Sequence, residues 1–279
     1  MIGSGTDGRP DSPGWGWKRS ITPEQPCNGA NNASIELGWG RAGETWQCIE
    51  TLEALGGASW FRLGDKDLAL HLHRSELMRG GATLTQATEK ICQAMNITHQ
   101  VLPMSDDPVA TIVHSDQGPL AFQHYFVREQ CAPEVTGFEF TGVAEAQVNT
   151  KLALWLEQCD GVIICPSNPF VSVDPLLALP GMRERLAALP VIAVSPIVGG
   201  IAIKGPAAKM MAELDMPASA AAVARHYEGL INGFVLDDTD AQQSSEITPP
   251  TLVCNTIMDS LQTRIRLAED CVAFLKTVL

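Results

Sequence analysis

Three short loops combine proline with small polar residues, and each follows an apolar run that is typical of a buried strand. Loop 104–108 (MSDDP) follows HQVLP, loop 166–169 (PSNP) follows GVIIC, and loop 195–200 (SPIVGG) follows VIAV. Proline fixes the local backbone, and the neighbouring hydroxyl, amide and carboxylate groups can then be turned toward a ligand. Because open α/β sheets bind ligands beyond the carboxyl ends of their strands, these loops predict one shared ligand edge.

Residues after the third loop indicate the kind of ligand. The pair Gly199-Gly200 permits close approach of the backbone, and Gly205-Pro206 is typical of a helix start that can face a phosphate. Lys209 can reach a phosphate, although a solvated helix lysine explains it equally well. No GxxxxGKS/T motif is present, which excludes an ordinary P-loop NTPase. Turns and helix caps without any ligand also explain Ser, Asn and Pro in a single loop, and this alternative stays open.

Segment 60–67 (WFRLGDKD) holds a second group of charged residues. Arg62 and Lys66 bracket a Gly-Asp turn, an arrangement able to hold an anionic or hydrogen-bonding ring system. Asp65 can equally cap the helix that follows, which by itself explains its position.

No catalytic residue is assigned from the sequence, because no Ser-His-Asp or Cys-His arrangement stands out. His71 and His73 are two residues apart and face different sides of a helix, which makes them poor joint metal ligands. The 8 cysteines are scattered, with no CxxC pair and no histidine at zinc spacing. We therefore expect reduced thiols and no protein-bound metal cluster.

Composition limits the class of protein. The chain has 279 residues, 45% of them hydrophobic, which is enough for one large α/β domain or two small ones. Its net charge of -13 disfavours sequence-independent nucleic-acid binding, which needs a basic surface. The start of the chain lacks the apolar core of a signal peptide, and no later run reaches the length of a membrane span. We expect a cytoplasmic protein with small-molecule substrates, no nucleic-acid partner and no membrane partner.

The spacing of apolar residues predicts an irregular or disordered segment over 1–37 and regular elements from residue 38 onward. The expected helices lie at 42–55, 68–78, 84–95 (with Thr83 as N-cap), 150–158, 176–188, 206–214, 220–230 and from Ser260. The expected strands lie at 98–103, 110–114, 121–128, 138–141, 161–165, 191–195, 233–237 and 252–256. Short, continuous apolar strands that alternate with helices imply an α/β fold with a doubly wound, mostly parallel (Rossmann-like) sheet and a β-hairpin and helical insertion.

Four strings occur in the same order as in one known family: LGDKDLALHLHRSELMRGGATLTQAT, LPMSDDPVAT, CPSNPFVSVDPLLALPGMRE and VIAVSPIVGGIAIKGPAAKMM. They resemble the 2-phospho-L-lactate transferase family, and the likeness runs over about residues 38–240. This family builds the deazaflavin coenzyme F-420, and its bacterial members use phosphoenolpyruvate or a related acid.

The resemblance implies a reaction. A guanosine diphosphate-activated acid, such as lactyl-2-diphospho-5'-guanosine, would bind across the carboxyl edge of the sheet. The ribityl hydroxyl of 7,8-didemethyl-8-hydroxy-5-deazariboflavin would attack the phosphorus that bears the acid, and GMP would leave. The resemblance also implies a requirement for Mg2+, which neutralises charge on a diphosphate, and a homodimer.

The resemblance further implies roles for particular residues. Arg62, Asp65 and Lys66 fall where the family contacts the deazaflavin acceptor, in an insertion at about 60–135 of a single transferase domain over 38–279. The nucleotide-binding residues that it implies are Ser105, Asp106, Asp107, Ser167, Asn168, Pro169, Ser195, Pro196, Gly199 and Lys209.

The sequence departs from the family in its first part. A GGxGG turn and NTGDD-like and SPDLDT-like segments, which supply phosphate contacts and metal-binding aspartates in the family, are not found here. We therefore expect an incomplete N-terminal βαβ unit, an unrelated segment over 1–37 and weak metal-dependent turnover. Two alternatives follow: a guanine-nucleotide-binding fragment or pseudoenzyme of the family, or a sugar-nucleotide or phosphate-ester enzyme of similar fold.

Overall fold

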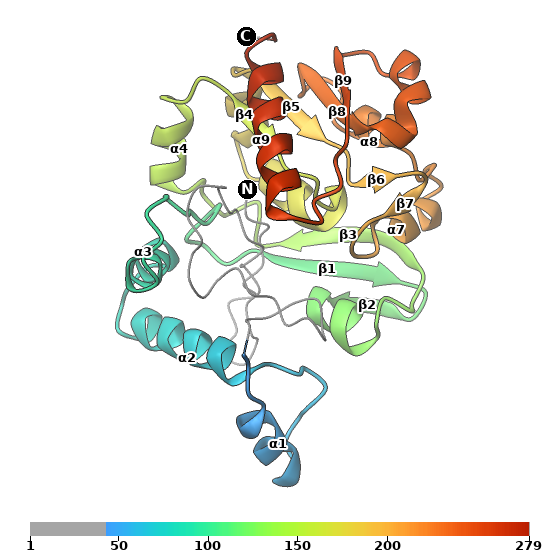
Figure 1. Ribbon diagram of the computed structural model, residues 1–279. Helices are drawn as coiled ribbons and strands as arrows, with labels where there is room; N and C mark the ends of the chain where they lie inside the picture. Colours follow the sequence, from blue (N-terminus) through green and yellow to red (C-terminus); the bar gives the residue numbers. More distant parts are fainter. Residues whose placement is uncertain (1–42, 279) are drawn as a thin grey trace.

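A sheet of four parallel strands organises the C-terminal half of the molecule (Figure 1). The computed structural model describes residues 43–278, so the segment 1–37 lies outside the described residues. The strands lie in the order β4 (Val162–Ile164), β5 (Val191–Val194), β8 (Gly233–Asp237) and β9 (Thr251–Cys254), and all three neighbouring pairs are parallel.

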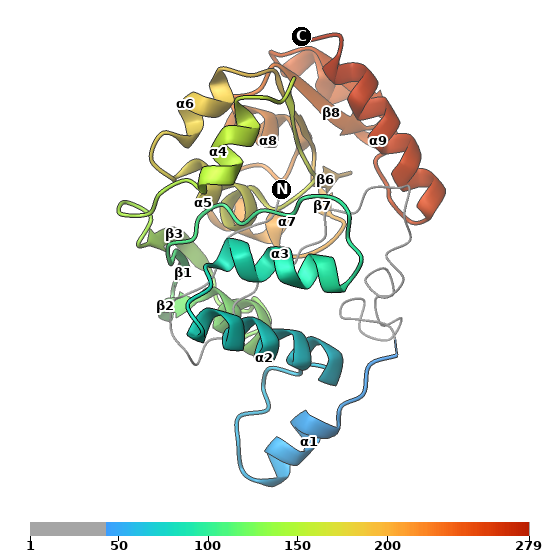
Figure 2. The same cartoon turned by 90° about the vertical axis from the view of Figure 1, so that its left-hand side faces the viewer.

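Helices cover both faces of this sheet, as the continuous apolar strands predict. Every residue of β5 and β8 is buried, which is the burial expected of strands covered on both sides. On one face, Leu267 and Cys271 of α9 (Leu261–Leu275) pack in a cluster with Ile192 and Val235. On the other face lies α8 (Ala220–His226), and the two views show α8 and α9 on opposite sides of the strands (Figures 1 and 2). The α/β fold class is confirmed.

The remaining helices of this half are short. They are α4 (Thr150–Leu156), η2 (Pro169–Val173), α5 (Asp174–Leu177), α6 (Met182–Ala187), α7 (Ala207–Glu213) and η3 (Asp238–Glu246). The single helix expected at 176–188 is divided into α5 and α6, because Gly181 adopts a left-handed conformation (φ 75°) between them.

An antiparallel sheet in the order β2-β1-β3 lies beside the parallel one, in the region of the predicted insertion. Its strands are β1 (Ala110–Ser115), β2 (Gly118–Ala121) and β3 (Val135–Thr141). The expected strand at 121–128 is wrong for its greater part, because residues from His124 to Arg128 form the π-helix η1. Phe122 and Phe126 are four residues apart and stack at 5.5 Å between ring centroids, which is a helical rather than a strand spacing.

The expected strand at 98–103 is also wrong, since that segment forms no ladder with any described strand. The residue that follows the segment, Met104, is held instead by a backbone hydrogen bond that its carbonyl accepts from the Asn149 N–H at 2.9 Å. Only the last three residues of the segment are half-buried, and the spacing of apolar residues alone does not reveal whether a pairing partner is present.

Among residues 43–278, three helices precede the antiparallel sheet: α1 (Gln47–Ala54), α2 (Asp65–Arg79) and α3 (Leu84–Ala94). The expected cap of α3 is confirmed, because Thr83 and Gln86 form a reciprocal capping box. Figure 2 shows α1 at the end of the molecule farthest from the parallel sheet.

One apolar core joins the two sheets. Val113 and Tyr125 from the antiparallel part belong to the same buried cluster as Ile164 of the parallel sheet. Phe138 of β3 stacks on Phe170 of η2 at 5.4 Å between ring centroids. The insertion is therefore packed firmly against the carboxyl end of β4.

Replacing Gly142 with alanine should destabilise the fold more than the same change at Gly181. Both residues have a positive φ, and forcing alanine into that region costs about 1–2 kcal/mol. A Cβ at Gly142 would also lie 2.5 Å from the Pro108 carbonyl oxygen, whereas a Cβ at Gly181 meets no atom within 4 Å. We expect a further loss of about 1–3 kcal/mol at Gly142 in urea unfolding. Equal losses in the two variants would contradict this contact.

Candidate functional site

At or just after the end of each of the four parallel strands, a polar side chain forms a hydrogen bond with the backbone of the loop that follows. The acceptor oxygens belong to Asn168 after β4, Ser195 after β5, Asp237 at the end of β8 and Asn255 after β9. Each accepts from the backbone N–H two residues further along, at 2.8 to 3.1 Å. Such side-chain turns fix a loop without regular structure. The carboxyl edge of the sheet, where α/β proteins bind ligands, is therefore lined by prefolded turns.

Asn168 ties the loop after β4 to a second segment of the edge. Its Oδ1 caps η2 through the Phe170 and Val171 N–H groups, and its Nδ2 lies 3.1 Å from the Met210 sulfur of α7. Asn168 and its neighbour Pro169 are buried, whereas Ser167 is half-buried. Of the three predicted residues in this loop, Ser167 has the side chain most accessible to a ligand.

The loop after β5 is a tight hairpin held at two points. The Ser195 hydroxyl donates to the Ile197 carbonyl at 2.8 Å while it accepts from the Ile197 N–H, and Pro196 between them is half-buried. Strands β6 (Ile197–Val198) and β7 (Ile201–Ala202) then pair through Gly199 and Gly200, whose φ angles are 57° and 79°. These positive φ angles give the two glycines a conformational role, whereas the close backbone approach stays a prediction.

Asp240, which sequence reasoning missed, anchors that hairpin. Its side chain is only 2% exposed, and its Oδ2 accepts from the Gly199 N–H at 2.9 Å while its Oδ1 accepts from Gln243. No motif marks this residue; the one available signal was its place three residues after the apolar strand GFVLD ends at Asp237.

Asp237 joins the ends of β8 and β9. Its Oδ2 accepts from the Thr256 N–H at 2.8 Å and from the Thr256 hydroxyl at 3.0 Å. Burial would raise the pKa of Asp237, but the hydrogen bonds from Thr256 and Thr239 outweigh it and hold this pKa below its ordinary value. The carboxylate is therefore charged and fully engaged near neutral pH.

The predicted loop 104–108 bonds to Thr85 and Gln147 rather than to the loops after β4 and β5. Asp106 Oδ1 accepts from the Thr85 N–H at 2.7 Å, and Asp107 Oδ2 accepts from the Gln147 N–H at 2.8 Å. The buried Ser105 hydroxyl accepts from the Asp107 N–H at 3.0 Å. Asp106 and Asp107 are both exposed, and each has one carboxylate oxygen that no described residue bonds.

The candidate acceptor residues lie around the first turn of α2, away from the parallel sheet (Figure 1). Hydrogen bonds to the Asp65 carboxylate from Thr45 (2.5 Å), Cys48 and Gln47 lower its pKa and cap α1. The Lys66 N–H donates to a Glu44 carboxylate oxygen at 2.9 Å. The start of α1 is thus capped by Asp65 of α2, and the start of α2 is capped by Glu44, which precedes α1.

Arg62 forms a flat cationic surface beside that pair of caps. Its guanidinium carbon lies 5.0 Å from the centroid of the Trp46 ring, in cation–π geometry. The side chain is exposed, so its outer face is open. Among the three predicted acceptor residues, Arg62 is the one whose geometry suits a planar ring.

Lys209, predicted to reach a phosphate, holds the start of β3. Its ammonium group donates to the Pro133 carbonyl at 2.8 Å and pairs with Glu213, whose other carboxylate oxygen accepts from the Val135 N–H at 3.1 Å. The ammonium also lies 5.9 Å from the centroid of the Tyr125 ring. These contacts connect α7 to the antiparallel sheet, which is a structural role that the sequence did not reveal.

Within residues 43–278, no group of three or more His, Cys, Asp or Glu side chains is arranged to hold a metal ion. The Mg2+ requirement implied by the resemblance stays a prediction, and no chemical step below passes through a metal ion. The seven described cysteines are free thiols. None of the helices in this part of the chain is long and apolar enough to cross a membrane.

A parallel sheet with helices on both faces and prefolded loops at its carboxyl edge defines an α/β protein of the class that binds ligands at that edge. The comparison with known families is more specific: residues 44–251 match the model of 2-phospho-L-lactate transferase CofD. The 2-phospho-L-lactate transferase of Methanosarcina acetivorans is 40% identical over 245 residues, which cover 86% of this chain and 79% of that protein. The phosphoenolpyruvate transferase of Kitasatospora aureofaciens is 36% identical over 254 residues, covering 87% and 79%. The chain belongs to the 2-phospho-L-lactate transferase CofD family, as its motifs predict.

The solved structures support the fold. A crystal structure of a member of the UPF0052 family from Bacillus halodurans matches with a TM-score of 0.52 and 11% identity, covering 76% of this chain and 73% of that one. At this identity the likeness concerns the fold alone.

Replacing Asp237 with asparagine should remove a pH-dependent part of the stability. Because the pKa is lower in the folded state than the unfolded value of about 3.9, the charged form stabilises the fold above that pH. The stabilisation is lost as pH falls through the folded pKa. We expect the variant to lose about 1–3 kcal/mol at pH 7, and the difference from the unchanged chain to shrink below pH 4.

Urea unfolding between pH 3 and 7 measures this difference, with Asp238→Asn as control because Asp238 is an exposed neighbour. A pH-independent difference, or an equal loss in the control, would show that the Asp237 carboxylate does not carry the effect.

Proposed function

We propose that this protein transfers a phospho-acid group, of the 2-phospho-L-lactate or phosphoenolpyruvate type, in coenzyme F-420 biosynthesis. The donor in this proposal is the guanosine diphosphate-activated acid, and the acceptor is the ribityl hydroxyl of 7,8-didemethyl-8-hydroxy-5-deazariboflavin. The observation that carries the proposal is membership of a family whose relatives are named as transferases of both acids. We further propose that the protein acts as a homodimer in the cytoplasm.

The proposed donor site is the carboxyl edge of the parallel sheet. Ser167 and the exposed Gly199 present accessible groups there, while Asn168 and Ser195 fix the shape of the two loops. Backbone amides held in place before the ligand arrives lose little entropy on binding and suit a diphosphate well. The exposed carboxylate oxygens of loop 104–108 complete the site in this proposal.

The proposed acceptor site lies on the insertion, near Arg62. A guanidinium group already stacked on Trp46 offers a planar cationic face, and a ring with hydrogen-bonding edges can stack on it or bond to its N–H groups. Asp65 and Lys66 set the turn that carries Arg62.

The proposed reaction is a displacement at phosphorus. The ribityl oxygen forms a bond to the phosphorus that bears the acid, and the bond from that phosphorus to the oxygen of the GMP phosphate breaks. The hydroxyl proton goes to solvent, and GMP leaves with the electron pair of the broken bond. Such transfers depend mainly on positioning and charge stabilisation. The protein contributes by holding donor and acceptor in line.

A second candidate is a guanine-nucleotide-binding member of the family that does not turn over, because the GGxGG, NTGDD-like and SPDLDT-like segments are not found in this sequence. The two candidates differ in one observable, which is product formation.

Incubation of the purified 279-residue chain with guanylylated 2-phospho-L-lactate or phosphoenolpyruvate donor, deazaflavin and Mg2+ tests the proposal. We expect GMP and the phosphodiester product, measured by liquid chromatography with mass detection. The matched control is the adenosine form of the same donor, which we expect to react at least about tenfold more slowly, since a pocket built to hydrogen-bond one base leaves polar groups unpaired with another. Calorimetric GDP binding without product would instead establish the second candidate.

A further inference from the structure

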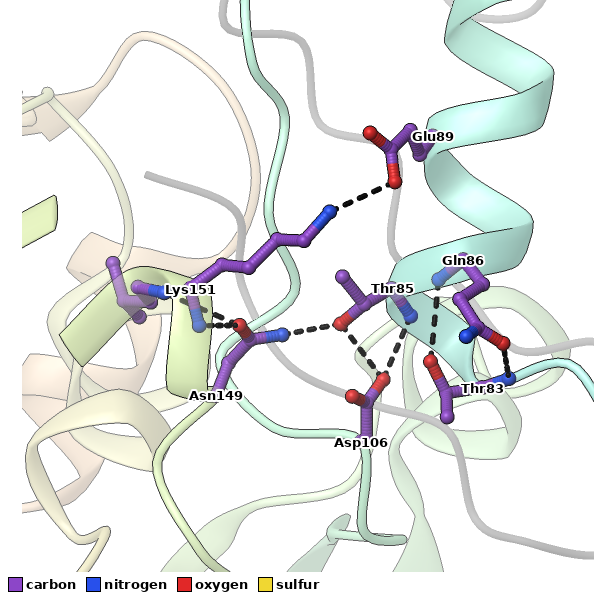
Figure 3. A network of polar contacts seen from close by, with 8 residues as sticks. Thr83, Thr85, Gln86, Glu89, Asp106, Asn149 and Lys151 are labelled. Carbon is purple, nitrogen blue, oxygen red and sulfur yellow. Dashed lines mark hydrogen bonds and ion pairs between the residues drawn. The ribbon is translucent and has the colours of Figure 1, made fainter. Parts of the chain in front are cut away.

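A chain of hydrogen bonds connects three segments that are distant in sequence (Figure 3). The Asn149 side chain, just before α4, donates through Nδ2 to the hydroxyl of Thr85 at the start of α3. The Thr85 hydroxyl in turn donates to Asp106 Oδ1 at 2.8 Å, and the Thr85 N–H donates to the same oxygen at 2.7 Å. We name Asn149, Thr85 and Asp106 the relay.

The relay has a fixed direction. A hydroxyl has a single proton, and here Thr85 accepts from an amide that can only donate, so its own proton is committed to Asp106. Asn149 Oδ1 cannot exchange places with Nδ2, because it accepts from the Lys151 and Leu152 N–H groups at 2.9 and 3.2 Å. Both ends are therefore defined by backbone groups.

The relay is buried at one end and open at the other. Asn149 is only 3% exposed and Thr85 is buried. A hydrogen bond lost there would therefore leave a buried polar group with no partner, because water does not reach it. Asp106 is exposed, and its Oδ2 takes part in no hydrogen bond among the described residues. The arrangement thus holds one carboxylate oxygen in place and leaves the other without a hydrogen bond from the described residues.

We propose that Asn149 and Thr85 are positioning residues for the transfer reaction, and that they act by orienting the free oxygen of Asp106 toward the donor. The Asn149 N–H bond to the Met104 carbonyl fixes the same loop from its other end. This inference rests on the proposed function and deepens it, because it names the side chains that aim one predicted donor contact. Neither positioning residue touches the substrate.

Three substitutions distinguish a positioning role of the relay from a role in folding. Asn149→Asp keeps the oxygen that caps α4, but the new carboxylate has no N–H to donate, and it competes with Asp106 for the Thr85 proton. Thr85→Val keeps the branched shape without the hydroxyl. Thr85→Ser keeps the hydroxyl and should restore the relay. The matched control is Glu89→Gln, which removes only a half-exposed ion pair with Lys151 beside the relay (Figure 3).

We expect Asn149→Asp and Thr85→Val to lower kcat/KM for the donor about tenfold to a hundredfold, while KM for the deazaflavin stays within about threefold. Thr85→Ser and Glu89→Gln should stay within about threefold for both. Hydrogen exchange measured on the same proteins should show faster exchange of backbone N–H groups in segment 104–107 for the first two variants alone.

Unchanged donor kcat/KM in Asn149→Asp and Thr85→Val would overturn the inference, and so would an equal rise in KM for both substrates. Loss of the folded state in both variants would overturn it too, because the relay would then maintain the fold rather than aim a carboxylate. If the unchanged protein itself shows no turnover, the proposed function fails; hydrogen exchange still reports whether the relay orders the loop.

Discussion

The carboxyl edge of the parallel sheet depends on one constraint: polar groups that are buried there must find hydrogen-bond partners. Loops that leave a buried strand cannot use a ladder, so a side chain of the loop bonds its backbone instead. Asn168 and Ser195 do this after β4 and β5, and Asp237 does it after β8 while also reaching Thr256. The edge is therefore shaped before any ligand arrives.

This constraint changes how the candidate residues are understood. A hydroxyl such as that of Ser195 both donates and accepts within its own turn, so its contribution to a ligand is the position of the backbone around it. Asp240 also acts through the backbone, because its carboxylate accepts a hydrogen bond from the Gly199 N–H and so fixes the position of that glycine. The sequence left two interpretations of these polar residues open, turn formation and ligand binding. The two are compatible, because a side chain that fixes the turn also places the backbone that a ligand would meet.

Much of the fold could be predicted because local signals and tertiary packing agree. Continuous apolar runs marked β4, β5 and β8, and the Thr83 cap marked the start of α3. The failures came where packing overrode the local signal: segment 98–103 ends in apolar residues but has no described strand partner, and residues from His124 fold into a π-helix that buries Tyr125. Periodicity does not contain that information.

Prediction of the site was limited in the same way. Loops after strands were found because proline and small polar residues are local signals, whereas the contacts of Lys209 and Asp106 are made with segments many residues away. Asn149 and Asp240 lie outside the quoted motifs, and Thr85 lies in one without any local signal of its role, so only burial and hydrogen-bond partners mark these side chains. Sequence reasoning finds where a ligand edge lies more readily than which atoms form it.

The most direct test is a crystal structure of the full chain with GDP bound. The account predicts the diphosphate against backbone N–H groups of the loops after β4 and β5, with Asn168 Oδ1 still bonded to the Phe170 N–H and Ser195 Oγ to the Ile197 N–H. A nucleotide bound away from this edge, or either side chain released from its own turn to bond the ligand, would contradict it.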